Sequence, residues 1–241
     1  LSFCLIQYSS FLTKSGILGE SSVHSFTDLG MTGQLAISLF FYVFLSIGLI
    51  IWRNKDFPKN KKEDHLWSRE FWMFMGALVL MISAFQIEFS TSFPVINKLF
   101  GTNLAPSSER IEYYNKWQLP LAVLISAMVA FTQFMKYKRT EPRLLLKQLS
   151  LSIGAALALT VTAGMIFTIT NPLVLLLIFT SSWAIASNLD YVIRILNGKF
   201  SKAGASIAHV GFGLIMLGAL ISTSQSDVIS ENTSLYDVSV L

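Results

Sequence analysis

The stretch LSLSIGAALALTVTAGMIFTITNPLVLLLIFTSSWAIASNLDYV, residues 149–192, decides the fold class. It holds two apolar runs, 149–169 and 172–192, and each is long enough to cross a bilayer as a helix of about 20 residues. The runs meet at the tripeptide TNP, and its proline, Pro172, suits the first turn of a helix. The stretch therefore predicts a tight hairpin of two spanning helices.

The rest of the 241 residues extends this pattern. Hydrophobic residues make up 53% of the chain and charged residues only 13%, whereas a soluble domain carries about 25% charged residues. This composition excludes a soluble enzyme, a disordered tail and a disulfide scaffold; the single Cys4 is expected to pack as a small hydrophobe. We predict an all-α, polytopic transmembrane helix bundle of about six spans, preceded by a partial helix at 1–12. The further spans are placed at roughly 32–52, 71–90, 119–135 (with Pro120 in its first turn) and 204–222.

Basic residues predict the orientation of the spans. The loops 53–70, 136–148 and 193–203 carry 14 of the 18 lysines and arginines. Because basic loops stay in the cytoplasm, the remaining segments, 13–31, 91–118 and 223–241, are expected on the outer side. Topology explains the net charge of +4, so the sequence gives no reason to expect a nucleic-acid partner.

His209 is the strongest candidate for chemistry, because it lies inside the last span, where ionisable groups are costly and usually functional. Ala205 and Gly213 lie one turn to either side and could leave clearance for a flat macrocycle, with Phe212 and Met216 at its edges. A neutral imidazole can bind a metal through one nitrogen while a second partner holds the other. The alternative is a histidine hydrogen-bonded to a neighbouring helix. A separate stripe of small residues supports packing on another face: Gly204, Ala208, Gly211 and Gly218.

The other polar candidates give weaker signals. His24 lies in an outward loop rich in glycine and serine, which suits either solvation or a site at the outer interface. His65 is expected to be a solvated loop residue. Asp190 and Arg194 are spaced as a helical ion pair, and Glu88 is expected at the outer interface, with a proton or substrate role as the alternative. Trp183 is expected to pack within its span, whereas four tryptophans are expected at headgroup level: Trp52, Trp67, Trp72 and Trp117. No catalytic motif is present, so no catalytic residue is assigned.

Four short segments together resemble one family. They are FLTKSGILGESSVHSF at 11–26, LWSRE at 66–70, YYN at 113–115 and AHVG at 208–211. These segments and their order resemble the motifs of the CcmF/NrfE family. Its members are the haem lyase subunits of cytochrome c maturation. The family has alanine where this chain has Ser25. The resemblance covers nearly the whole chain.

The resemblance implies two haem-iron ligands and a set of partners. His24 would be an axial ligand to haem at the outer surface, and His209 an axial ligand to a buried b-type haem. The implied partners are a CcmE-like haem chaperone, apocytochrome c and CcmH-like subunits, and the implied location is the bacterial inner membrane. The family's enzyme joins haem to the cysteines of apocytochrome c as thioethers.

The resemblance also implies that segments are missing. In the family, the tryptophan-rich WWD segment and two further histidine ligands precede the segment that 11–26 resembles. We therefore expect the chain to be the C-terminal part of a longer protein, inactive in haem ligation by itself. Its expected organisation is a truncated helix and outward haem-site loop at 1–31, a helical bundle with outward loop 91–118 at 32–222, and an outward tail at 223–241 that begins a longer periplasmic region.

Two other interpretations stay open. The chain could be a non-enzymatic membrane transporter or accessory subunit, in which His209 relays protons or packs helices. It could also resemble the related CcsA family, which has an outer histidine after a WWD motif. The extra spans that end in AHVG argue against the second possibility.

Overall fold

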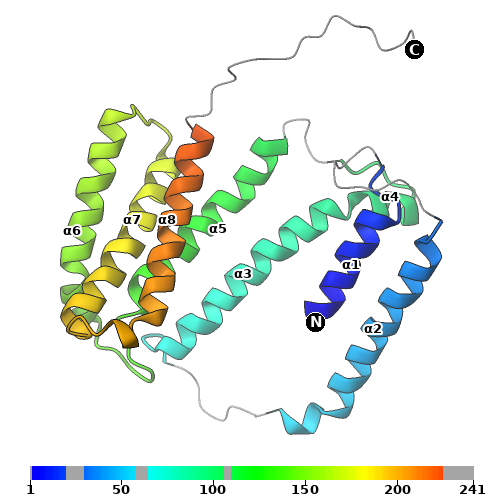
Figure 1. Cartoon of the computed structure of the whole chain (residues 1–241), viewed down its shortest axis with the longest axis horizontal. Coiled ribbons are helices and arrows are strands. Elements are labelled where there is room, and N and C mark those ends of the chain that lie inside the picture. The colour runs from blue at the N-terminus through cyan, green and yellow to red at the C-terminus, as the bar shows by residue number, and fades with distance from the viewer. Residues whose placement is uncertain (1, 20–29, 58–64, 106–109, 225–241) are drawn as a thin grey trace, which may run out of the picture. The chain divides into compact units, whose positions relative to one another are not determined.

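A computed structural model describes residues 2–19, 30–57, 65–105 and 110–224, and within them every regular element is helical (Figure 1). The predicted all-α fold is thus confirmed. The chain divides into two compact units, formed from 1–64 with 80–118 and from 65–79 with 119–241. These units are described separately below. The three-part organisation predicted from topology concerns sidedness and stays a prediction.

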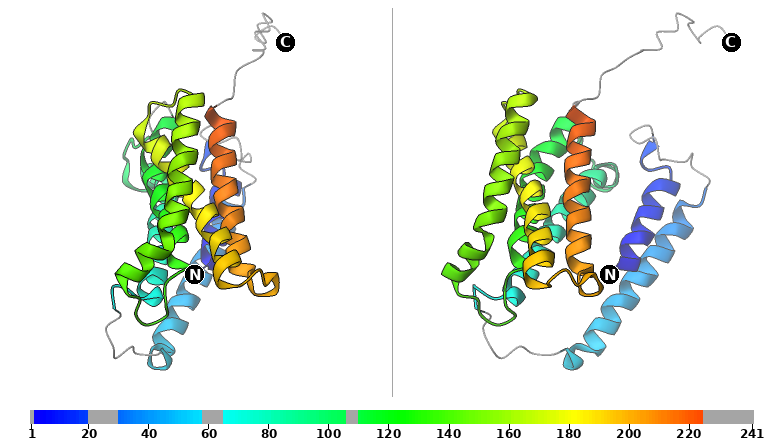
Figure 2. Two further views of the ribbon diagram at one scale, coloured as in Figure 1. Left: turned by 90° about the vertical axis from the view of Figure 1, so that its left-hand side faces the viewer. Right: turned by 60° about the vertical axis from the view of Figure 1, so that its left-hand side comes forward.

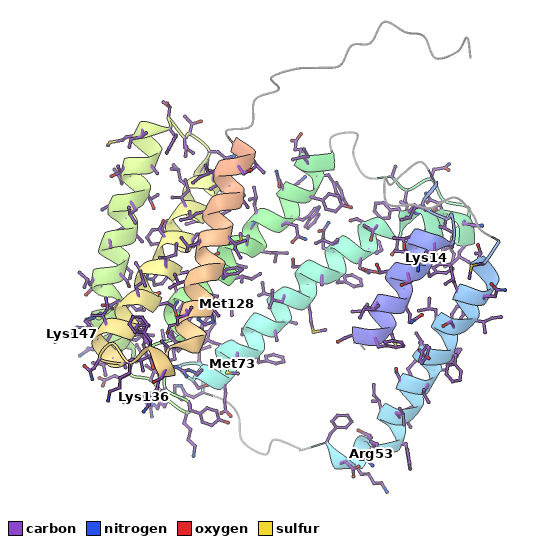
Figure 3. The ribbon with its side chains drawn as sticks, viewed as in Figure 1. Lys14, Arg53, Met73, Met128, Lys136 and Lys147 are labelled. Atoms are coloured by element: carbon purple, nitrogen blue, oxygen red, sulfur yellow. The ribbon has the colours of Figure 1, made fainter. Side chains whose placement is uncertain are left out.

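The first unit pairs α1 (Ser2–Lys14) with α2 (Thr32–Trp52), which lie side by side (Figure 1, Figure 2). Cys4 lies against α2, with its Sγ 3.3 Å from the Ser46 hydroxyl oxygen. Figure 3 shows Lys14 and Arg53 at opposite ends of this pair. The unit also contains α4 (Phe93–Phe100) and the adjoining parts of α3 (Arg69–Thr91) and α5 (Arg110–Thr132).

The second unit centres on α7 (Pro172–Asp190), which packs against both α6 (Pro142–Ile166) and α8 (Gly204–Ser224). A π-helical turn, Tyr191–Ile195, follows α7. The hairpin predicted at Pro172 is confirmed: Asn171 precedes α7, and its side-chain oxygen accepts hydrogen bonds from the backbone N–H groups of Leu173 (2.9 Å) and Val174. This N-cap satisfies two of the donors that open the helix.

The core of the second unit lies near one end of the α6–α7 pair. It is formed by Phe134, Met135, Leu145 and Leu149, with Trp183 packed against it. The Trp183 indole N–H donates to the Ser152 hydroxyl at 3.2 Å, so the packing role predicted for this tryptophan is confirmed. Lys136 and Lys147 lie at this same end of the unit (Figure 3).

Five helices of the described residues are long and apolar enough to cross a membrane: Thr32–Trp52, Arg69–Thr91, Pro142–Ile166, Pro172–Ile195 and Gly204–Thr223. The apolar segment predicted at 119–135 is instead the second half of α5. Because α5 begins at Arg110, Pro120 lies inside the helix, and its predicted place in a first turn is wrong. The polar first half of α5 stays helical because Tyr113 and Gln118 hydrogen-bond to α3. The helix continues past Pro120 although proline donates no backbone hydrogen bond.

Candidate functional site

His209 lies on α8 and is half-buried against α7. Its Nδ1 is 3.2 Å from the side-chain oxygen of Asn188. Asn188 is fully buried (0% exposed), and its amide nitrogen donates to two backbone carbonyls, of Ala184 (2.9 Å) on α7 and Val129 (3.3 Å) on α5. Asn188 thus connects α5, α7 and α8 at the level of the imidazole.

The His209 imidazole therefore has one nitrogen engaged and one available. No hydrogen bond to its Nε2 occurs within the described residues. Histidines that bind metals usually have this arrangement, in which a fixed partner holds the nitrogen that does not face the metal. The residues present thus offer one imidazole nitrogen as a single metal ligand. Sequence reasoning missed Asn188, although an amide within an apolar span, in the last turn of α7, was the signal that could have identified it.

Gly213, predicted to leave clearance beside His209, is instead a packing residue. A Cβ added at Gly213 would lie 2.6 Å from Cγ1 of Ile185 and 3.0 Å from the carbonyl oxygen of Ser181. Gly213 thus lets α7 approach α8 closely, and the clearance for a macrocycle predicted beside it is wrong. The reason is that Gly213 shares with His209 the helix face that meets α7.

The stripe assigned to packing is instead open in the part of the chain that the structure describes. A Cβ added at Gly204, Gly211 or Gly218 would meet nothing within 4 Å. Ala205 and Ala208 are exposed. On α8 these two alanines neighbour His209, whereas Gly211 and Gly218 lie on the side of the helix opposite the imidazole.

Hydrogen bonds fix the start of α8 just before His209. Ser206 is buried, and its hydroxyl accepts from the Gln133 side-chain amide at 3.2 Å. The Gln133 carbonyl in turn accepts from the Arg69 guanidinium at 2.7 Å, and this carbonyl lies just beyond the end of α5. A cation at a helix C-terminus is favoured by the helix dipole. Arg69 of the segment 66–70 is therefore linked through Gln133 to Ser206, which lies two residues before the segment 208–211.

Of the other candidate residues, those that the structure describes make hydrogen bonds that do not involve His209. The Nδ1 of exposed His65 accepts from the Trp67 backbone N–H at 3.1 Å, which is a local turn contact. His24 lies outside the described residues, so its role stays a prediction. The predicted Asp190–Arg194 ion pair is confirmed, and Arg194 also donates to the Gln148 carbonyl at 2.7 Å. No group of three or more metal-binding side chains occurs in the described ranges.

The first unit contains a second polar cluster, between α3 and α5. The Gln118 amide donates to the Gln86 side-chain oxygen at 2.6 Å, and Gln118 accepts from the Ser83 hydroxyl at 2.5 Å. The Gln86 amide donates to Ser90 at 3.2 Å, and Ser90 lies 3.1 Å from the Tyr113 hydroxyl. Tyr113 belongs to the YYN segment, so this segment holds α5 to α3.

Glu88 lies beside this cluster on α3. Its Oε1 is buried without a hydrogen-bond partner among the described residues. Its backbone carbonyl accepts from the Ser92 hydroxyl at 2.5 Å, which in turn accepts from Tyr8 of α1 at 2.6 Å. Within the first unit these bonds connect α1 to the end of α3, where the sequence predicts an interfacial Glu88.

A cavity of about 460 Å³ lies between α6, α7 and α8 in the second unit. It is mainly apolar, with Phe167, Ile178 and Leu217 among its lining residues and Asn171 at the hairpin. His209 does not line it, so the imidazole and this cavity are separate features of the unit.

Comparison with known proteins identifies relatives of the chain. The cytochrome c-type biogenesis protein CcmF of Pseudomonas fluorescens is 28% identical over 236 residues, and that of Pseudomonas aeruginosa is 26% identical over 235 residues. Each match covers 93% of this chain and 35% of the relative, so the chain spans about a third of the length of these relatives. No protein-family model and no solved structure matches. The chain is homologous to the CcmF proteins over almost its whole length.

Proposed function

We propose that the chain handles haem during cytochrome c maturation in the bacterial inner membrane, with His209 as an axial ligand to a buried b-type haem. The observation that carries the proposal is the His209 imidazole, held at Nδ1 by buried Asn188 and without a hydrogen bond at Nε2 in the described residues. Similarity to proteins named for cytochrome c-type biogenesis supports it.

The residues around His209 have distinct roles in this proposal. Bound haem would supply an iron that changes between its ferrous and ferric states. The neutral imidazole is the form that binds metal. Asn188 fixes the ring, while Arg69 and Gln133 fix the start of α8 through Ser206. The exposed flank at Ala205 and Ala208 leaves the side of the ring open.

The outer part of the proposal rests on His24. This histidine would be an axial ligand to haem at the periplasmic surface, where a CcmE-like haem chaperone delivers haem and CcmH-like subunits present apocytochrome c. The segment 11–26 that contains it gives the proposal its support, through its resemblance to the haem lyase family. A transporter or accessory subunit would instead use His209 to relay protons or to pack helices.

The test uses the protein expressed from its natural gene in membranes with the host maturation machinery. His209→Ala should remove the reduced-minus-oxidised difference spectrum of a b-type haem, while the protein still inserts at normal levels. His65→Ala is the matched control, because His65 is exposed and makes only a local contact. A b-type spectrum that survives His209→Ala would overturn the ligand assignment.

A second variant separates the two proposed haems. His24→Ala should lower the haem captured at the outer surface and leave the buried b-type spectrum intact. Loss of both signals together would contradict the proposal of two separate sites.

A further inference from the structure

Asn188 has hydrogen-bond partners that determine which way its amide points. The amide has one donor end and one acceptor end. One end lies within hydrogen-bond distance of two backbone carbonyl oxygens, of Ala184 and Val129, and carbonyl oxygens only accept. That end must therefore be the NH₂ group. The side-chain oxygen is then the atom that faces His209, at 3.2 Å from Nδ1.

This orientation also determines the protonation of the imidazole. An amide oxygen only accepts, so the Nδ1 of His209 must carry a hydrogen to bond with it. A neutral imidazole has a single N–H, so Nε2 is left with its lone pair. The carbonyls of Ala184 and Val129 orient the amide of Asn188, and the amide oxygen in turn determines which nitrogen of His209 is free to bind a metal.

We infer that Asn188 is a positioning residue that holds His209 in the Nδ1-protonated tautomer and so leaves the lone pair on Nε2, the nitrogen that is free to bind a metal. The choice of tautomer follows from contacts within the chain; its importance for haem rests on the proposed function. Asn188 is well suited to this role because it is fully buried and bonded to three helices, so its amide cannot rotate without losing both carbonyl contacts.

The first experiment reads the tautomer in the protein without haem. Histidine labelled with ¹⁵N in the full protein in lipid nanodiscs gives separate Nδ1 and Nε2 resonances, and a His209→Gln sample identifies those of His209. The native protein should show a protonated Nδ1 and an unprotonated Nε2. A protonated Nε2 in the native protein would overturn the inference, whether or not His209 binds haem.

Three variants test whether Asn188 is the cause. Asn188→Leu removes the acceptor, so both tautomers should be populated. Asn188→Asp should keep the native tautomer, because one carboxyl oxygen can accept from Nδ1 while a protonated hydroxyl donates to a carbonyl. Ser187→Ala is the matched control, because Ser187 is equally buried and bonds to the same Ala184 carbonyl without touching His209. A native tautomer in the leucine variant, or a changed one in the control, would contradict the inference.

The second experiment measures haem in the loaded protein. Loss of a partner of this kind weakens metal binding by about 10–100-fold, so Asn188→Leu should release haem that much more readily. Its haem midpoint potential should rise, because an imidazole without an Nδ1 hydrogen bond donates less charge to ferric iron. Asn188→Asp and Ser187→Ala should stay near native. Native affinity and potential in Asn188→Leu would overturn the inference, whereas a b-type spectrum that survives His209→Ala would instead overturn the proposed function.

Discussion

Two polar clusters lie within apolar helices of this protein, and they differ in how completely their hydrogen bonds are used. In the α3–α5 cluster of the first unit, Ser90 donates to the Gln86 backbone carbonyl at 2.9 Å, so the Tyr113 hydroxyl must donate to Ser90. The Gln118 amide uses both its hydrogens, on Gln86 and on the Ser83 carbonyl. The Asn188–His209 pair of the second unit leaves one imidazole nitrogen without such a bond in the described residues.

This difference separates a structural cluster from a candidate site. A buried polar group stays costly unless it is hydrogen-bonded, most of all where lipid replaces water. In the α3–α5 cluster, hydrogen bonds among its own side chains offset the free-energy cost of burial, so no ligand is needed to explain it. The His209 imidazole has one nitrogen without such a bond in the described residues, and this is the nitrogen for which we propose a ligand. Mutations that damage each cluster should therefore affect different observables.

The largest expected effect on stability is at the α7–α8 contact. Gly213→Ala would place a Cβ against Ile185 and the Ser181 carbonyl, and overpacking of this kind costs about 1–3 kcal/mol. Because the substitution pushes α7 from α8, it should also weaken the bond between Asn188 and His209. Reversible unfolding in mixed micelles measures the first effect, and the b-type spectrum measures the second.

Gly218→Ala is the matched control on the same helix, since its added Cβ would meet nothing within 4 Å. It should not destabilise the protein and should raise the free energy of unfolding by up to about 1 kcal/mol, because alanine has the higher helix propensity. Equal destabilisation by the two substitutions would contradict the close α7–α8 approach.

The next effect should appear in the α3–α5 cluster. Gln118→Leu leaves Ser83 and Gln86 without their shared partner, and interhelical hydrogen bonds in membranes contribute about 1–2 kcal/mol at most. The free energy of unfolding should fall by that amount while the haem spectrum stays native. A spectrum lost at unchanged expression would show that this cluster is not merely structural.

Tyr113→Phe gives a graded comparison in the same cluster. It removes one hydroxyl, while Ser90 keeps its bonds to Gln86, so the loss should be smaller, at about 0.5–1 kcal/mol. The same unfolding assay measures it. A larger loss than that of Gln118→Leu would show that the tyrosine, and not the glutamine, holds α5 to α3.

Helix periodicity explains what could be predicted from the sequence and what could not. Apolar run length placed the hairpin at Pro172, and i,i+4 spacing identified the Asp190–Arg194 pair, because both depend on local sequence. Spacing also showed that Gly213 and His209 share a face. It could not show that this face meets α7, because the choice of neighbour depends on packing between distant segments. The same limit hid Asn188 as the partner of His209, and the polar bonds of the half of α5 that precedes Pro120.

The smallest effect is expected at the surface of the second unit, where Arg194 pairs with Asp190. The arginine side chain is 43% exposed, and helical i,i+4 pairs at exposed sites contribute about 0.3–0.5 kcal/mol. Arg194→Lys keeps the charge but removes the planar guanidinium group, which also donates to the Gln148 carbonyl. The substitution should therefore lower the free energy of unfolding by no more than about 0.3–0.5 kcal/mol. Because salt screens exposed pairs, the difference between native and variant in unfolding free energy should shrink as salt is added. A difference that salt leaves unchanged would mean that the bond to Gln148, rather than the ion pair, stabilises this end of α7.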